Sequence, residues 1–591
     1  MSSQISRWYL PFKISRDFGP GTGREPRLVD GITGQQPNRS QGSNAPRFQW
    51  LIETALIALA FSLYAGSPAP NVNESHYLTK ATHFWNPQWC AGDLFLGSSF
   101  SHWFFYAVLG WPTKFLTLTQ YAWFGRILTW VLLAFAWQRL SFAVVPFRFM
   151  SVLSAMFFLL LNDRFHMAGE WVVGGFEAKG IAYFFVVLAL SFVVKGRWKY
   201  VWPLLGAASA FHVLVGGWSV LACFYCCAAG WIRRGNERSM DPGFWKARLK
   251  ENLIGLTLGG LLALPGIIPP ILADLGTRRE TILHAHNIYV SHRISHHLDF
   301  GAFPVWHVAR FALMVAVWAV LYKWLRDRLL QNPIIFHRKL EPIRDFAAGA
   351  LVISFAGLVL SGGAELGKQF PVSLLRFYWF RLADFAIPVS VSLGCCFVIV
   401  FWLERERDLL RRCSCMLFVV CILLASVLMI RDKHRVAIPN ADLRSLPQYP
   451  GSPERFYQSW QNWKKMCHWV SENTAADAVF ITPDQQQTFK WYAGRIEVVA
   501  WKDIPQDAQS IVEWDRRLIE LNDIQKAADL ELFQYSDEKL AEFAQEYVAD
   551  YMIVPQRVYD LAAADPSFDR STYEQVYPAP GVKSTWVVLK F

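Results

Sequence analysis

The chain has 591 residues, of which 53% are hydrophobic, and it contains 27 tryptophans and 45 phenylalanines. This composition excludes an ordinary soluble enzyme and indicates a polytopic α-helical membrane protein. The formal net charge of +11 does not indicate a nucleic-acid partner, because the lysines and arginines cluster in short segments between apolar runs and do not interleave with aromatic residues on a polar face.

Residues 1–47 form the first distinct segment. They are basic and rich in glycine, proline, asparagine and serine, a composition that is typical of disordered tails. The apolar run that follows has no small-residue cleavage motif behind it, so we expect a cytoplasmic tail and no cleaved signal peptide.

Residues 48–430 contain the predicted transmembrane domain. A crossing needs about 20 apolar residues, and windows that approach this length lie at 50–66, 122–137, 149–161, 181–194, 253–272, 305–325, 346–360, 385–402 and 415–430. Two short crossings within 200–232 bring the predicted total to about eleven transmembrane helices, whereas a re-entrant pair there would give nine with the same topology. Residues 103–118 contain Pro112 and Lys114 and are instead expected to form an amphipathic interfacial helix.

The distribution of positive charge predicts the orientation. Segments expected inside, at 195–199, 233–250, 323–344 and 405–412, hold 19 lysines and arginines, whereas four outer loops that are longer in total hold 10. These outer loops are loop one (67–121), loop two (162–180), loop three (275–302) and loop four (364–382). Because cytoplasmic loops are enriched in lysine and arginine, we expect a cytoplasmic N-terminus and a periplasmic or extracellular position for residues 431–591.

Residues 431–591 are predicted to form a soluble α/β domain. Short strands are expected at 478–482, 496–500, 551–554 and 585–589, and they alternate with helical patterns at 454–471 and 507–521. This alternation favours a small layered domain. The domain has no nucleophile elbow, phosphate-binding loop or glycine fingerprint, so we assign it no catalytic role.

Loop one carries two candidate catalytic carboxylates, Glu74 and Asp93. An ionised side chain at the bilayer centre costs roughly 2.5–3.5 kcal/mol or more, so acids beside a span are expected in a watery cleft. A carboxylate there could act as a general base. The alternatives are a structural salt bridge for Glu74 and ordinary turn chemistry for Asp93.

The order of motifs in loop one resembles the GT-C superfamily of integral-membrane glycosyltransferases. The motifs are Asn73-Glu74, Tyr77, Trp85-Asn86-Pro87 and Gly92-Asp93, followed by an amphipathic aromatic stretch. A common form of the acidic motif in that superfamily is Asp-Glu, so Asn73 is a departure that leaves Glu74 as the acid. The sharper part of the resemblance covers residues 72–110.

The resemblance implies transfer of a hexosyl or pentosyl group at the outer face of the cytoplasmic membrane. The donor would be a polyprenyl-phosphate sugar, and the acceptor a glycan, lipid or protein. Tyr77 would belong to the substrate site. Cationic groups, or a divalent metal ion such as Mg²⁺ or Mn²⁺, would hold the departing phosphate.

Loop two contains Asp163, Glu170 and Glu177. Some GT-C enzymes place a second acidic group in this loop, in some cases as a metal ligand, so the resemblance makes all three carboxylates candidate metal ligands. It also makes Glu177, which directly precedes a predicted span, a candidate substrate-binding residue. The alternative is an ion pair with Lys179 or Arg164.

Loop three combines Arg278, Arg279 and Arg293 with five of the 14 histidines. A zinc site would need matched geometry and supporting partners, and no acidic signature accompanies the histidines, so we prefer a phosphate-binding or lid role. A solvated flexible loop is the alternative. If the histidines contact a lipid phosphate, donor binding should tighten as they protonate below about pH 6.5.

A fourth cluster consists of Lys368, Arg376 and Arg381 in loop four and Asp384 just after it, with aromatic residues between the arginines. Arginines can clamp phosphate through two parallel hydrogen bonds, and the aromatic residues could line a lipid or sugar groove. The alternative is an aromatic belt with snorkelling arginines.

A non-catalytic protein is the competing hypothesis: a lipid-linked saccharide transporter, or an envelope assembly scaffold of GT-C-like shape. Asn73 favours this hypothesis, since it removes one acid of the common motif. Convergence of Glu74, Asp93 and Glu177 on one outward cavity, beside Arg376 or Arg381, would favour the enzyme. Carboxylates scattered over separate surfaces would favour the competing hypothesis.

Overall fold

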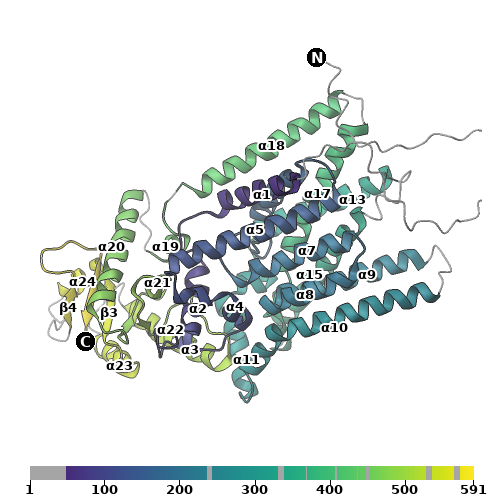
Figure 1. Ribbon diagram of the computed structural model, residues 1–591. Coiled ribbons are helices and arrows are strands. Elements are labelled where there is room, and N and C mark those ends of the chain that lie inside the picture. Colours follow the sequence, from purple (N-terminus) through teal and green to yellow (C-terminus); the bar gives the residue numbers. More distant parts are fainter. Residues whose placement is uncertain are drawn as a thin grey trace, which may run out of the picture. The chain divides into compact units, whose positions relative to one another are not determined.

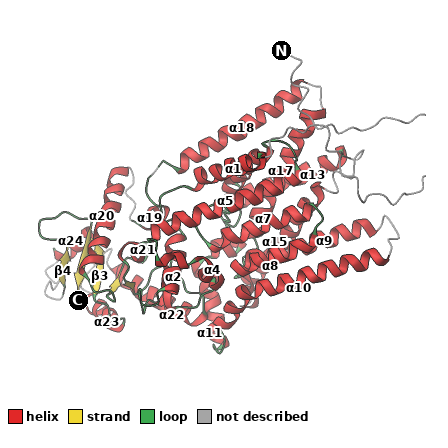
Figure 2. Ribbon diagram, in the orientation of Figure 1, coloured by secondary structure: helices red, strands yellow, loops and turns green. Residues whose placement is uncertain are grey.

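The computed structural model describes residues 48–235, 242–329, 339–367, 369–405, 409–435, 437–446, 452–527, 536–564 and 573–591. The described chain is mostly helical, with one small sheet formed by residues close to the C-terminus (Figures 1 and 2). The predicted tail, residues 1–47, lies outside the described residues.

Seven helices in the described part of the chain are long and apolar enough to cross a membrane. They are α5 (Leu118–Val144), α9 (Val213–Gly235), α10 (Pro242–Ala273), α13 (Val305–Arg328), α15 (Glu341–Glu365), α17 (Arg381–Arg405) and α18 (Leu409–Lys433). Helices α1 (Gln49–Ala65) and α7 (Ala178–Val194) are apolar but shorter, and α6 (Met150–Arg164) and α8 (Trp198–Phe211) occupy two further predicted windows. A multi-pass membrane protein is therefore confirmed, whereas the number of about eleven spans stays a prediction.

Helix α5 is longer than its predicted window. The Thr117 hydroxyl accepts a hydrogen bond from the Gln120 N–H, and the Gln120 side chain accepts one from the Thr117 N–H, which together form a capping box. The predicted interfacial helix at 103–118 is instead divided into α4 (Trp103–Leu109) and the 3₁₀ turn η2 (Trp111–Lys114). Pro112 in that turn and the cap at Thr117 explain why the segment does not continue as one helix.

Helices α5, α7, α8 and α10 lie side by side in this order (Figure 1). Gly206 of α8 and Gly259 of α10 allow direct backbone contact, because a Cβ atom on Gly206 would lie 2.1 Å from the Gly259 carbonyl oxygen. Small residues at such crossings are typical of membrane helices. Helix α8 ends at Phe211 and α9 begins at Val213, so the pair that we expected within 200–232 consists of two separate helices.

The C-terminal residues form a five-stranded mixed sheet of order β2-β1-β3-β5-β4. The strands are β1 (Val479–Ile481), β2 (Ile496–Glu497), β3 (Tyr551–Pro555), β4 (Glu574–Tyr577) and β5 (Trp586–Lys590), with α20 (Pro453–Asn473) and α22 (Ala508–Ala527) among the surrounding helices. Strand β1 is parallel to β2 and β3, and β5 is antiparallel to β3 and β4. Four strands and both helices coincide with the predicted segments.

Strand β4 was not predicted. It is an edge strand, its register with β5 shifts between Gln575 and Tyr577, and its residues do not alternate between buried and exposed positions. The period-two pattern that identifies a strand in a sequence is therefore missing.

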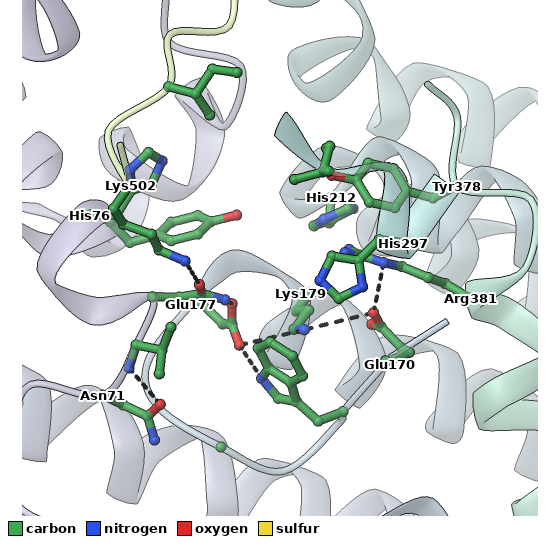
Figure 3. A pocket seen from close by; sticks show the side chains of 18 of the residues that line it. Asn71, His76, Glu170, Glu177, Lys179, His212, His297, Tyr378, Arg381 and Lys502 are labelled. Carbon is green, nitrogen blue, oxygen red and sulfur yellow. Dashed lines mark hydrogen bonds and ion pairs between the residues drawn. The ribbon is translucent and has the colours of Figure 1, made fainter. Parts of the chain in front are cut away.

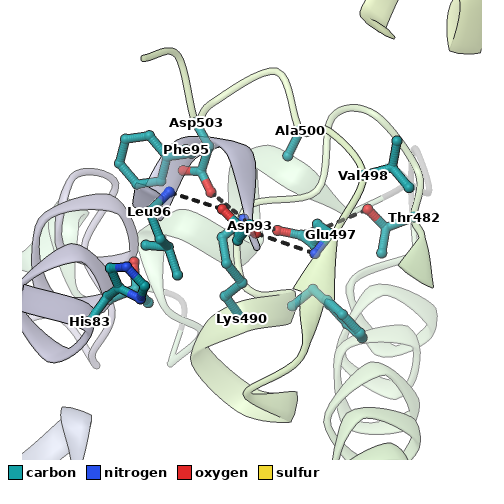
Figure 4. Close-up of polar contacts among 12 residues, drawn as sticks. His83, Asp93, Phe95, Leu96, Thr482, Lys490, Glu497, Val498, Ala500 and Asp503 are labelled. Carbon is teal, nitrogen blue, oxygen red and sulfur yellow. Dashed lines mark hydrogen bonds and ion pairs between the residues drawn. The ribbon is translucent and has the colours of Figure 1, made fainter. Parts of the chain in front are cut away.

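A buried ionic cluster joins loop one to the C-terminal sheet (Figure 4). Lys490, on α21 (Phe489–Ala493), places its ammonium 3.2 Å from Asp93, 2.6 Å from Glu497 and 2.8 Å from Asp503. Asp93 also caps α3 (Leu94–Gly97) by accepting the Leu96 N–H. This geometry corrects the expectation for Asp93, because its carboxylate is held by a lysine and two backbone N–H groups and serves the contact between loop one and the sheet.

Replacing Lys490 by methionine should destabilise this contact strongly. Three buried carboxylates would lose their shared cation, and breaking a buried pair from one side costs about 3–5 kcal/mol. We expect a lower midpoint of thermal unfolding in detergent. Lys583→Met, at an exposed position, is the matched control, and equal midpoints for the two variants would contradict the assignment.

Candidate functional site

A cavity of about 1030 Å³ lies where loops one to four meet the C-terminal domain. Its lining includes eight cationic side chains: Lys80, Lys179, Arg293, Arg376, Arg381, Lys433, Arg444 and Lys502. Three carboxylates share this lining: Asp163, Glu170 and Glu177. The excess of positive charge in a concave, partly apolar space favours an anionic ligand.

Glu177 lies at the centre of a chain of polar contacts in the cavity (Figure 3). It directly precedes the first turn of α7, and its Oε1 accepts a hydrogen bond from Trp171 Nε1 at 3.0 Å. Its Oε2 accepts one from Asn73 Nδ2 at 2.8 Å, and Asn73 Oδ1 accepts one from Lys502 Nζ at 2.8 Å. The amide of Asn73 therefore joins a carboxylate of loop two to a lysine of the C-terminal domain.

Lys179 connects Glu177 to a second buried carboxylate, that of Glu170. The Lys179 ammonium lies 3.7 Å from each of the two glutamates, and Arg381 Nε lies 3.3 Å from Glu170 Oε2. The Arg381 guanidinium also stacks on the Tyr378 ring at 3.7 Å. The result is a row of alternating charges, Glu177, Lys179, Glu170 and Arg381, along one wall of the cavity (Figure 3).

Asp384 positions loop two from the first turn of α17. Its carboxylate accepts hydrogen bonds from the backbone N–H groups of Met167 at 2.6 Å, Ala168 at 2.8 Å and Glu170 at 3.3 Å. Three backbone donors on one buried carboxylate fix the path of the loop. Asp384 does not line the cavity, so we assign it a positioning role for Glu170.

Glu74 lies outside the cavity and is fully occupied by donors. Arg126 Nε and Nη2 donate to its two oxygens at 2.6 Å each, and both side chains are completely buried. The Phe176 N–H and Asn71 N–H donate to the same carboxylate at 2.7 Å. Gly175 permits this approach, since a Cβ atom there would lie 2.8 Å from Glu74 Oε1. The geometry is that of the structural salt bridge, and Glu74 is not available as a base.

The expected convergence of three carboxylates is therefore not observed. Glu74 and Asp93 are held in separate buried ion pairs, and Glu177 alone of the three lines the cavity. Tyr77, Arg376 and Arg381 do line it, as expected, and the Tyr77 hydroxyl lies 3.0 Å from His102 Nε2. Lys368 lies outside the described residues.

Loop three contributes to the cavity through some of the residues that we singled out there and not through others. Arg278 and Arg279 are exposed at the start of α11 (Arg279–Asn287) and do not line it. Arg293, at the end of the π-helical turn η3 (Ile288–Arg293), does line it. Loop three therefore supplies one arginine to this cavity, Arg293, and a substrate-binding role for Arg278 and Arg279 stays a prediction.

Three of the five loop-three histidines line the cavity: His286, His296 and His297. Burial, followed by the positive charge of Arg376, lowers the pKa of His286 to about 4. Burial and Arg381 lower the pKa of His297 to about 2. Burial and the neighbouring arginines therefore disfavour protonation of these two side chains near pH 6.5, and the tightening of donor binding at lower pH stays a prediction.

The candidate metal ligands do not fit a divalent cation. Asp163 lies 2.8 Å from the ammonium of Lys433, and Glu170 and Glu177 share Lys179. In the part of the chain that the structure describes, no group of three or more histidine, cysteine, aspartate or glutamate side chains could hold a metal ion. Because each carboxylate already faces a cation, a second cation there would be repelled, and no chemical step is assigned to a metal.

The C-terminal domain contributes cavity residues that the sequence did not reveal. Arg444 and Lys502 line the wall, together with Gln485, Gln487 and Gln506. No motif marks these positions. One sequence signal could have identified Lys502, because it lies directly after the predicted strand at 496–500. Binding residues are concentrated on loops that a rigid scaffold positions.

Comparisons with known proteins identify a short family match and two distant structures. Residues 461–521 match a domain of unknown function (DUF6798), and no curated protein matches the chain. The oligosaccharyltransferase AglB of Archaeoglobus fulgidus, in complex with an inhibitory peptide and a dolichol-phosphate, is 10% identical with a TM-score of 0.45. This alignment covers 87% of the present chain and 71% of that protein.

A second structure of an Archaeoglobus fulgidus oligosaccharyltransferase, in complex with zinc and sulfate, is 12% identical with a TM-score of 0.39. The alignment covers 91% of the present chain and 72% of the other. Both comparisons describe a distant similarity.

Removing Arg126 should unfold the region around Glu74. Arg126→Gln leaves a buried carboxylate without its guanidinium partner, and we expect a loss of about 3–5 kcal/mol, measured as a lower midpoint of thermal unfolding. Adding Glu74→Gln should cost less than the sum of the two single changes.

Arg326→Gln is the control for this experiment, because Arg326 and Asp327 form an exposed pair that is worth at most about 1 kcal/mol. Similar midpoints for Arg126→Gln and Arg326→Gln would show that the buried pair does not hold the fold.

Proposed function

We propose that this protein is a GT-C-like membrane glycosyltransferase that transfers a sugar from a polyprenyl-phosphate donor in the cationic cavity. The observation that carries the proposal is the cavity itself, which places eight cations and three carboxylates where the loops meet the C-terminal domain. Its volume of about 1030 Å³ is sufficient for a sugar phosphate, because ligand pockets commonly have about 300–1,000 Å³. The proposed orientation puts this cavity at the outer face of the cytoplasmic membrane.

The departing phosphate would be held by Arg376, Arg381 and Lys179. The stacking of Arg381 on Tyr378 and the hydrogen bond between Arg376 and His286 fix both guanidinium groups before a ligand arrives. Preorganised cations stabilise the charge that develops on a leaving phosphate without reorganisation in the reaction. These groups perform the role that a divalent ion would otherwise have.

Glu177 is the proposed general base. Its two oxygens accept one hydrogen bond each from Asn73 and Trp171, which orients the carboxylate and leaves further lone pairs for an acceptor hydroxyl. The acceptor oxygen would bond to the anomeric carbon with inversion while the bond to the phosphate oxygen breaks. The hydroxyl proton passes to Glu177, and the electron pair of the broken bond leaves on the polyprenyl phosphate.

A non-catalytic transporter or scaffold is the second candidate, and a specific observation favours it. Loop one has two carboxylates, Glu74 and Asp93, and both are consumed by structural ion pairs. Asn73 meets the cavity at the position where the superfamily motif commonly has an acid. A protein that binds a lipid-linked saccharide without transferring it would need the cations and not the base.

Turnover separates the two candidates. Purified protein should transfer radiolabelled sugar from a panel of polyprenyl-phosphate donors, and Glu177→Gln should reduce the rate by about 10²–10⁴-fold with unchanged donor affinity. Glu454→Gln, exposed on α20, is the matched control. Donor binding by an inert wild-type protein would establish the second candidate, and full turnover by Glu177→Gln would remove Glu177 from the mechanism.

Asn73→Asp tests how the base is controlled. A carboxylate at position 73 would replace the amide donor 2.8 Å from Glu177 and repel its negative charge, which raises the pKa of a base. We expect the acid limb of the pH–rate profile to move to higher pH by about one unit. The double variant Asn73→Asp/Glu177→Gln should be inactive. If it instead transfers sugar, the carboxylate introduced at position 73 acts as the base, and Glu177 is not essential.

A further inference from the structure

Three cations gather on the side of the cavity that the C-terminal domain forms. Arg293 comes from loop three, Arg444 from α19 (Asn440–Ser445) and Lys502 from the segment after β2. Arg293 Nε donates to the Trp501 carbonyl at 2.9 Å, its guanidinium stacks on the Trp501 ring at 4.9 Å, and Lys502 donates to Asn73. Within the described ranges of the chain, none of the three forms an ion pair with a carboxylate.

The two acids nearest to this trio are already engaged. Glu177 faces Lys179 and accepts hydrogen bonds from Asn73 and Trp171. Asp503 lies 2.8 Å from Lys490 and 3.2 Å from His76. The positive charge of the trio therefore has no counter-charge of its own.

The crowding of positive charge affects Lys502 itself. Burial, with the neighbouring charges of Arg293 and Arg444, lowers the pKa of Lys502 to about 7 despite the opposing effect of Glu177. A bound anion would relieve this repulsion, because an opposite charge favours the charged form of the amine.

Amide side chains complete the surroundings of the trio. Gln485, Gln487 and Gln506 line the same cavity, and the buried Oε1 of Gln487 has no hydrogen-bond partner among the described atoms. Amides present both donors and acceptors, which suits a hydroxylated ligand. A ligand of this site would thus combine one anionic group with hydroxyl or amide groups.

Lys502, one member of the trio, lies away from Arg381 of the proposed donor phosphate site. Figure 3 shows Lys502 on one side of the row formed by Glu177, Lys179 and Glu170, and Arg381 at the opposite end. Glu177 thus lies between two cationic ends of one cavity. With the donor phosphate at Arg381, the end at Lys502 is open to the second substrate.

We infer that Arg293, Arg444 and Lys502 form an anion subsite that binds a phosphate or carboxylate group on the acceptor. The assignment of the ligand to the acceptor rests on the proposed function. The assignment of an anion to this subsite rests on the cavity alone. Lys502 and the three glutamines lie within residues 461–521, so the inference also gives this domain of unknown function a role in recognising the acceptor.

Amine labelling of the purified full-length protein tests the subsite. An amine whose pKa is about 7 is largely neutral at pH 7.5 and reacts with an acylating reagent, and peptide mass spectrometry measures the extent at Lys502. Inorganic phosphate, acetate and a short-chain polyprenyl phosphate are titrated as separate probes. We expect saturable protection of Lys502 of at least about fivefold by phosphate or acetate, with the exposed Lys583, which does not line the cavity, as the internal control.

Arg293→Gln should weaken this protection about tenfold, with Arg326→Gln as the matched control and thermal unfolding as the check on folding. Protection by phosphate alone indicates a phosphate subsite, whereas protection by acetate as well indicates that the subsite also binds a carboxylate. Labelling that no probe changes overturns the subsite. Protection by polyprenyl phosphate alone assigns the trio to the donor and overturns the acceptor inference.

The labelling experiment requires no sugar transfer, so it can contradict the anion subsite without contradicting the proposed function, and the reverse. A protein that protects Lys502 and transfers no sugar keeps the anion subsite and loses the proposed function. A protein that transfers sugar while Lys502 reacts freely keeps the function and loses the subsite.

Discussion

A charge buried away from water must find a partner, and this requirement decides which carboxylates in the protein remain free for chemistry. Glu74 is held by Arg126 and two backbone N–H groups, and Asp93 by Lys490. Both acids of loop one are therefore parts of the scaffold. Of the acidic motif in loop one, only the neutral amide of Asn73 reaches the cavity. The carboxylates that line the cavity come from loop two.

The scaffold and the candidate site share residues of loop one. Asp93 ties the loop to the C-terminal sheet, while Asn73 hydrogen-bonds to Lys502 of the same C-terminal domain and to Glu177 of loop two. The C-terminal domain, to which no sequence motif assigned any chemistry, thus forms part of the cavity wall. In the proposed function, its position there would connect recognition of the acceptor with the carboxylate that accepts the proton.

Hydropathy and periodicity predicted the apolar helices that are long enough to cross a membrane and four of the five strands, because both depend on local pattern. They also predicted which loops hold the site, since ionisable residues beside membrane spans are costly and retained for a reason. They did not predict partners. Arg126 lies 52 residues from Glu74, within the apolar window at 122–137, and Lys490 lies in another domain from Asp93. The sequence shows that a buried acid needs a cation, but packing alone decides which cation it meets.

A structure determined with a bound short-chain polyprenyl phosphate would test the central claim most directly. The account predicts the lipid phosphate inside the cavity, within about 4 Å of the guanidinium or ammonium groups of Arg376, Arg381 or Lys179, with the anomeric position of a sugar donor directed toward Glu177. A phosphate bound outside the cavity, with these cations still facing Glu170 and His286, would contradict it.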